Sequence, residues 1–162
     1  MTAINSRIFS SEDETATLKT ILFVEDEDFL RTVIADVLTG AGYHVLAASN
    51  GVEATEVRAQ YHGPLHLLLT DFCMPLKNGE ILAEELRAAE PDLRTIFISG
   101  YGDIAKSAPP SDRISFLPKP FSIRALISKI RETLDTADAK NIGAATFNEK
   151  IEPVHTLAAV AS

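Results

Sequence analysis

The chain has 162 residues, 46% of them hydrophobic, which is enough for one buried core with some chain to spare. Its formal net charge of -8 argues against nucleic acid as a direct partner, because phosphate backbones attract basic surfaces. Cys73 is the single cysteine, so an internal disulfide and a cysteine-rich zinc site are excluded, and a reducing cytoplasm is expected.

The first half of the chain begins with a polar stretch and then alternates strand and helix patterns. Residues 1–18 are expected to form a flexible leader, and they lack the basic stretch and apolar core of a signal peptide. A strand is predicted at 20–24, followed by a helix whose apolar residues recur at helical spacing until Gly40. Residues 43–47 are predicted to form the second strand, and Asn50 is placed to cap the second helix.

The second half repeats this alternation. Strands are predicted at 65–70, 95–99 and 114–117, and helices at 79–89 and after a capping serine at position 122. Strand–helix alternation with short connections implies right-handed crossovers and a mostly parallel sheet. We expect one domain over residues 19–135 and, because residues 136–162 lack a steady period, a disordered tail. No apolar run approaches the roughly 20 residues needed to span a bilayer, so membrane insertion is not expected.

Four charged side chains follow directly on the predicted strands. Glu25 and Asp26 close the first strand, Asp71 closes the third, and Lys119 stands between two prolines after the fifth. The carboxyl ends of parallel strands meet at one edge, where open α/β sheets hold their ligands. Three acids gathered there repel one another unless a cation joins them, and hard oxygen ligands favour Mg²⁺. Asp71 could then act as a nucleophile, with Lys119 balancing an incoming phosphoryl group.

Each of these residues has a simpler interpretation when it is taken alone. Glu25 and Asp26 could be a solvated helix start, which the helix dipole favours. Asp71 could form a turn, and Lys119 could be an ordinary surface lysine. The site hypothesis depends on all of them falling at strand ends in one repeating α/β frame.

Five short motifs in fixed order carry a resemblance to a known family. They are the segments Ile21–Glu27, Leu69–Pro75, Asn78–Gly79, Ile98–Gly102 and Leu117–Phe121. Together they resemble the receiver domain of bacterial two-component response regulators, over about residues 19–135. The resemblance implies an α/β, flavodoxin-like three-layer sandwich with a five-stranded parallel sheet in the order 2-1-3-4-5.

The resemblance also implies roles for individual residues. Asp71 aligns with the aspartate that accepts a phosphoryl group, and Glu25 and Asp26 align with the acidic pair that helps to hold Mg²⁺. Cys73 falls where a backbone carbonyl completes the metal site, so its thiol need not be a ligand. Lys119 aligns with the lysine that pairs with a phosphoryl oxygen, and its bond to the following proline is expected to be cis.

Two further residues align with the conformational switch of the family. Ser99 matches the hydroxyl residue that hydrogen-bonds the phosphoryl group, and Phe116 matches the switch aromatic. From the residues alone, Ser99 could simply end a strand and Phe116 could be a static core residue. Both of these alternatives stay open at this point.

The chain departs from the family pattern in three places. Glu25 stands where aspartate is frequent, and Ser99 replaces the commoner threonine while keeping the hydroxyl group. Consecutive prolines, Pro109–Pro110, cannot occupy the interior of a helix. The fourth helix of the family, between the fourth and fifth strands, is therefore expected to be shortened or irregular.

The resemblance implies a stand-alone phospho-receiver of a cytoplasmic phosphorelay. It would take phosphate from a histidine kinase or a histidine phosphotransfer protein and then change its contacts with a downstream protein. Such a protein is no enzyme beyond its own phosphorylation and dephosphorylation. The alternative is a magnesium-dependent phosphohydrolase with an aspartyl nucleophile, but the second aspartate that such enzymes use is replaced by Cys73. A nucleotide-binding Rossmann domain would need a glycine-rich turn after the first strand, which the sequence lacks.

Overall fold

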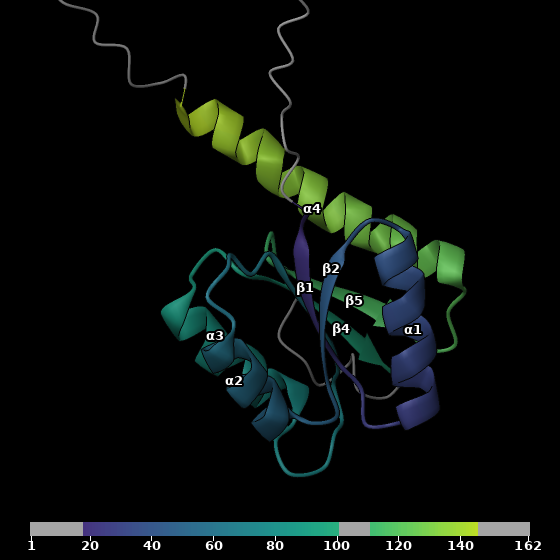
Figure 1. The fold of residues 1–162 in the computed structure, drawn as a ribbon. Coiled ribbons are helices and arrows are strands. Elements are labelled where there is room, and N and C mark those ends of the chain that lie inside the picture. Colours follow the sequence, from purple (N-terminus) through teal and green to yellow (C-terminus); the bar gives the residue numbers. More distant parts are fainter. Residues whose placement is uncertain (1–17, 101–110, 146–162) are drawn as a thin grey trace, which may run out of the picture.

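The computed structural model describes residues 18–100 and 111–145, with side chains as far as residue 136. Its strands are β1 (Thr20–Val24), β2 (His44–Ala48), β3 (Leu67–Asp71), β4 (Arg94–Ser99) and β5 (Ile114–Pro118). All pair in parallel, in the order β2-β1-β3-β4-β5, as Figure 1 shows in part. This is the order implied by the family resemblance, so the predicted flavodoxin-like sheet is confirmed.

Helices cover both faces of the sheet. They are α1 (Asp28–Gly40), α2 (Gly51–Gln60), α3 (Gly79–Ala89) and α4 (Ile123–Ala145). In Figure 1, α1 and α4 lie on one side of the strands, and α2 and α3 on the other. Polar side chains cap the N-termini of three of these helices. The caps Asn50 and Ser122 were predicted, and Asn78 caps its helix in the same way. Asn50, Asn78 and Ser122 each accept a hydrogen bond from a backbone N–H in the first turn.

Two hydrophobic cores result from the alternation of side chains along the strands. The core under α1 and α4 includes Ile21, Phe23, Leu67, Leu69, Ile96, Ile98, Leu126 and Ile130. The core under α2 and α3 includes Leu22, Val24, Leu68, Phe97, Leu82 and Leu86. Since β1, β3 and β4 contribute to both cores, their residues read as continuous apolar runs, which is typical of parallel strands covered on both faces.

Element boundaries differ slightly from the predictions. β1 and α3 begin and end as predicted, whereas β3 begins at Leu67 and not at Leu65. Leu65 is nevertheless buried in the core under α2 and α3, so its apolar character reflects packing rather than strand pairing. An apolar run alone does not separate these two causes.

The last helix extends past the expected end of the domain. α4 continues to Ala145, so residues 136–145, expected as part of a disordered tail, are helical. This stretch holds several alanines and no proline, which favours a helix even without a periodic apolar face. The remaining expectations for the leader and the tail fall on 1–17 and 146–162, and the irregular fourth family helix falls on 101–110. All three segments lie outside the described residues. Within the described part of the chain, no helix has the length and apolarity to cross a membrane.

Candidate functional site

Three carboxylates meet at the carboxyl edge of the sheet. β1 pairs with β3 so that Val24 lies beside Thr70, which places the next residues, Glu25 and Asp71, side by side. With Asp26, they offer carboxylate oxygens that all lie within 4.8 Å of one another. Glu25 and Asp71 are buried, and Asp26 is exposed. The structure therefore brings together the three acids that the strand ends predicted.

Glu25 has one carboxylate oxygen engaged and the other without a partner. Oε1 accepts a hydrogen bond from the backbone N–H of Glu27 at 3.2 Å, while Oε2 is buried with no hydrogen-bond partner among the residues that the structure describes. Burial raises the pKa of Glu25, and the charge of Asp71 adds to this, against the opposing effects of the Glu27 N–H and Lys119. The side chain thus has a carboxylate oxygen available for a ligand, and burial makes its charged form less stable than it would be in water.

Asp71 and Lys119 form a close ion pair across the site. Lys119 Nζ lies 2.6 Å from Asp71 Oδ2, and Asp71 Oδ1 accepts a hydrogen bond from the backbone N–H of Cys73 at 3.2 Å. Burial alone would lower the pKa of Lys119, but the hydrogen bond and charge of Asp71, with the charges of Glu25 and Asp26, raise it overall. Lys119 is therefore held as a cation among the acids.

Backbone contacts fix the loop that carries the lysine. The Lys119–Pro120 peptide bond is cis, as expected. The backbone N–H of Lys119 donates to the carbonyl of Ser99 at 2.9 Å, which ties the end of β5 to the end of β4. Lys119, which follows the edge strand β5, thus reaches Asp71 at the end of the central strand β3.

Gly79 belongs to one of the five family motifs, but the sequence did not reveal its role as a positioning residue. A Cβ atom there would stand 2.3 Å from the backbone oxygen of Asp71, closer than such atoms approach. The N–H of Gly79 also donates to the carbonyl of Phe72 at 3.1 Å. The start of α3 is therefore pressed against the backbone around Asp71, which only a glycine allows. The Asn78–Gly79 motif was visible, but the close approach depends on how the loop after β3 folds back.

The two predicted switch residues lie beside this cluster. Ser99 is fully buried at the end of β4, and its Oγ has no hydrogen-bond partner in the described part of the chain. Phe116 is half-buried and stacks on Phe97, with ring centroids 5.6 Å apart. Phe97 in turn meets Phe72 edge-to-face at 5.5 Å. A row of three aromatic rings thus joins β5 to the residue that follows Asp71.

Sequence reasoning did not single out Phe72 or Phe97. The signal that could have found Phe97 is strand pairing, because Phe97 and Phe116 are register partners in β4 and β5. Cys73, in the turn after β3, is exposed, although a small apolar side chain of this kind is often buried. Its backbone N–H donates a hydrogen bond to Asp71 Oδ1.

The motifs, the sheet order and the acid–lysine cluster can now be compared with known proteins. A sequence model of the response regulator receiver domain matches residues 21–131. The chain belongs to this family. Receiver domains serve two-component signalling as phosphoacceptors, and the cluster around Asp71 is consistent with that role.

Named relatives support the assignment. The response regulator receiver protein CpdR of Brucella abortus is 39% identical over 123 residues, covering 74% of this chain and 100% of CpdR. The sensor kinase CckA of the same species is 39% identical over 121 residues, covering 74% of this chain but only 13% of the kinase. The crystal structure of the receiver domain from the hybrid histidine kinase CckA superposes with a TM-score of 0.60 at 34% identity. That match covers 71% of this chain and 98% of the solved domain.

Proposed function

We propose that Asp71 accepts a phosphoryl group from a phosphohistidine of a histidine kinase or a histidine phosphotransfer protein in the cytoplasm. The protein would then change its contacts with a downstream protein. The observation that carries this proposal is the meeting of Asp71 with two further acids within 4.8 Å and with Lys119 at 2.6 Å. A buried aspartate between a cation and an acidic pair has little structural purpose of its own, since gathering like charges costs energy.

The residues present fit a magnesium ion. Glu25, Asp26 and Asp71 are the carboxylate ligands that we propose, with the backbone carbonyl of Cys73 as a fourth. All are hard oxygen donors, and the buried Glu25 Oε2 has no other partner. When bound, Mg²⁺ supplies positive charge that offsets the repulsion between the acids and an incoming phosphoryl group.

The transfer needs positioning and charge neutralisation more than proton chemistry. A carboxylate oxygen of Asp71 forms a bond to phosphorus, and the phosphorus–nitrogen bond of the donor breaks with its electron pair moving to the imidazole. Lys119, held protonated by its acidic neighbours, balances a phosphoryl oxygen as a compact point charge. The product is an acyl phosphate on Asp71, which a catalysed attack of water later removes.

Ser99 and Phe116 are the proposed readout of this event. Among the described residues the buried Ser99 hydroxyl has no hydrogen-bond partner, so a phosphoryl oxygen on Asp71 would offer it a strong acceptor. Movement of Ser99 toward that acceptor would change the space available to Phe116, which could then leave its stacked position on Phe97 for a second packing. The partner that reads this change is a protein surface, not nucleic acid.

Intact-mass measurement after incubation with acetyl phosphate and Mg²⁺ tests the function. One phosphoryl group per chain is expected, absent from Asp71→Asn and from wild type without a divalent cation. The alternative magnesium-dependent phosphohydrolase predicts steady turnover of phosphate esters without stoichiometric labelling. The exposed Cys73 at the position of that family's acid/base aspartate favours the phosphoacceptor. Labelling of a folded Asp71→Asn variant would overturn the assignment.

A further inference from the structure

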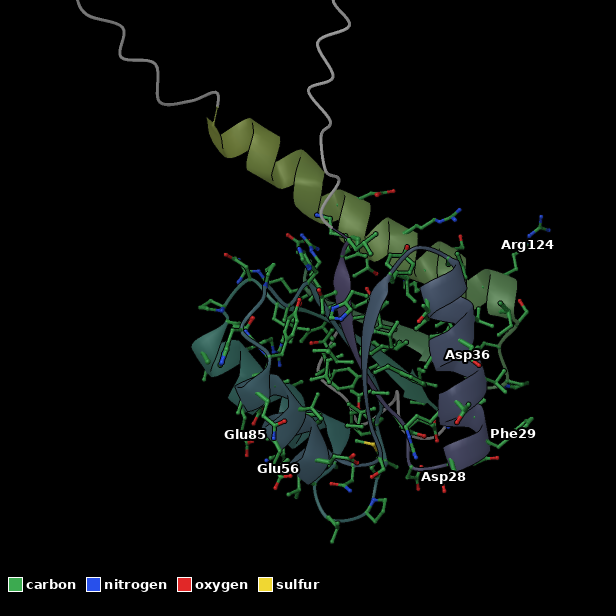
Figure 2. All side chains as sticks on the ribbon, viewed as in Figure 1. Asp28, Phe29, Asp36, Glu56, Glu85 and Arg124 are labelled. Atoms are coloured by element: carbon green, nitrogen blue, oxygen red, sulfur yellow. The ribbon has the colours of Figure 1, made fainter. Side chains whose placement is uncertain are left out.

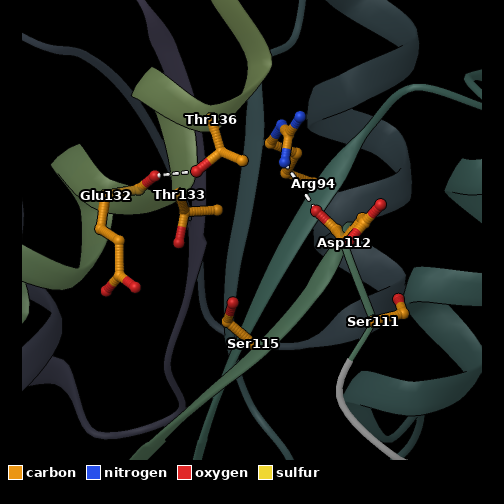
Figure 3. Close-up of a pocket in the computed structure, with 7 residues that line it drawn as sticks. All are labelled: Arg94, Ser111, Asp112, Ser115, Glu132, Thr133 and Thr136. Atoms are coloured by element: carbon orange, nitrogen blue, oxygen red, sulfur yellow. Dashed lines mark hydrogen bonds between the residues drawn. The ribbon is translucent and has the colours of Figure 1, made fainter. Parts of the chain in front are cut away.

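A second polar cavity lies at the opposite end of the sheet from Asp71. It has a volume of about 160 Å³ and opens between α4, the start of β4 and the start of β5. Figure 3 shows the seven residues that line it, Arg94, Ser111, Asp112, Ser115, Glu132, Thr133 and Thr136. Because β4 runs from Arg94 to Ser99, the whole length of that strand separates this cavity from the acid cluster.

The inner wall of the cavity carries a buried cation. Arg94 is only 7% exposed, yet among the described residues it forms no ion pair with any carboxylate. Its one hydrogen bond there runs from Nη1 to the backbone carbonyl of Asp112, at 2.7 Å. A guanidinium has five N–H donors, and buried charges are normally paired. The cavity therefore contains a cation whose remaining donors have no anionic partner in the described part of the chain.

Two hydroxyl groups face the same space. Thr133 on α4 is 6% exposed, and its Oγ1 is buried without a hydrogen-bond partner among residues 18–100 and 111–145. Ser115 is the register partner of Ile96, so it shares the α4 side of the sheet with Arg94, two residues before Ile96. In Figure 3 the hydroxyls of Thr133 and Ser115 turn toward each other across the cavity. The two hydroxyl groups and the guanidinium group therefore provide several hydrogen-bond donors. A ligand that carries acceptor oxygens would complement them.

The acids of the cavity lie at its rim and not on its inner wall. Asp112 and Glu132 are both exposed, and the Glu132 side chain, which is 70% exposed, pairs with Lys129. Exposed carboxylates are screened by water and salt, whereas the buried guanidinium is not. A volume of about 160 Å³ compares with roughly 30 Å³ for one water in the liquid, so it accommodates a ligand of several heavy atoms but no nucleotide.

We propose that this cavity binds a small oxyanion, either inorganic phosphate or a short carboxylate, between Arg94, Ser115 and Thr133. Arg94 would contribute paired N–H donors and charge, which match the geometry of either anion. Thr133 Oγ1 would gain a hydrogen bond that no described residue supplies. Since the ligand touches β4, β5 and α4 together, its binding stabilises the docking of α4 on the sheet.

The test is a titration of the full, metal-free chain with phosphate, acetate or oxalate, at constant ionic strength set with chloride. Metal is removed with a chelating resin, because a soluble carboxylate chelator would compete. Amide signals of Ser115 and Thr133 and the Arg94 Nε–H signal are followed by ¹H–¹⁵N NMR. Saturable shifts in these signals, with those of Asp71 and Lys119 unmoved, are the expected result. The anion that binds with the highest affinity identifies the ligand class.

Matched variants separate a built site from a water-filled gap. Thr133→Val removes the inward hydroxyl at nearly constant volume and should weaken binding about tenfold, the effect of one lost charge-assisted hydrogen bond. Thr95→Val is the control, because Thr95 Oγ1 is equally buried and unpartnered but lies on the α2 and α3 side of the sheet. Absence of saturable shifts with every anion, or equal affinity in wild type and Thr133→Val, would overturn the proposal. So would an equal loss of affinity in Thr95→Val.

Discussion

Replacing Glu25 by glutamine removes one charge from the acid cluster at almost constant side-chain size. The carboxylate oxygens of the cluster lie within 4.8 Å of one another. Two unit charges at about that distance repel by about 0.9 kcal/mol in water and by about 3.5 kcal/mol at an effective dielectric constant of about 20. Asp26 is exposed and Lys119 attracts Glu25, and both facts reduce the net repulsion. We therefore expect Glu25→Gln to raise the free energy of unfolding by about 1–2 kcal/mol in the absence of divalent cations.

The pH dependence of this effect has a definite sign. Burial raises the pKa of Glu25 above its ordinary value of 4.5, so the folded protein binds this proton more tightly than the unfolded chain does. Such a group stabilises the fold below the unfolded pKa and loses that contribution as the pH rises through the folded pKa. Wild type without metal should thus lose stability over this range, and Glu25→Gln should lose less.

Urea denaturation from mildly acidic to neutral pH, with and without Mg²⁺, measures both effects. Mg²⁺ should stabilise the wild type, and its effect should be much smaller in Glu25→Gln, which has lost a charged ligand. Glu84→Gln is the matched control, since Glu84 is exposed on α3 and outside the cluster. Lower stability of metal-free Glu25→Gln than of wild type, or equal stabilisation of the two by Mg²⁺, would refute the reasoning.

Further variants probe the acceptor, the loop around it and the aromatic row. Asp71→Asn should fold and should show no labelling by acetyl phosphate in intact-mass spectra. Gly79→Ala places a methyl group 2.3 Å from the backbone oxygen of Asp71, so it should destabilise the fold by about 1–3 kcal/mol in urea denaturation and slow labelling. Its control Gly40→Ala meets nothing within 4 Å and should be neutral or stabilising by up to about 1 kcal/mol. Phe97→Leu should leave labelling intact but reduce the phosphorylation-dependent shift of the Phe116 ring signals in NMR, and an unchanged shift would exclude coupling through this ring.

Local patterns in the sequence were sufficient to predict a parallel α/β sheet and the acid cluster, whereas the strand order came from the family resemblance. Apolar runs marked the strands, and Glu25, Asp26 and Asp71 each followed such a run directly. Once parallel strands are assumed, their carboxyl ends must share one edge, so the cluster needs no knowledge of side-chain packing. Lys119 was found in the same way, through its position after the fifth run.

Features that depend on strand register or on the path of a loop could not be predicted from these local patterns. The stacking of Phe97 on Phe116 requires knowing which residues of β4 and β5 pair. The contact of Gly79 with Asp71 requires the path of the loop between β3 and α3. The helical stretch up to Ala145 has favourable propensity but no apolar period, so a search for periodicity ends the helix too early.

Both sites contain buried polar atoms that have no hydrogen-bond partner among the described residues. In native proteins nearly all buried polar groups have a hydrogen-bond partner, so a buried polar atom without one is unusual. Glu25 belongs to the acid cluster with Asp71, Ser99 ends β4, and Thr133 lines a cavity beside Arg94, which has no ion pair among the described residues. Thr95 Oγ1 is orphaned as well, but it is not among the residues that line that cavity. The orphaned atom is therefore a pointer to a ligand only where a second group of complementary chemistry faces the same space.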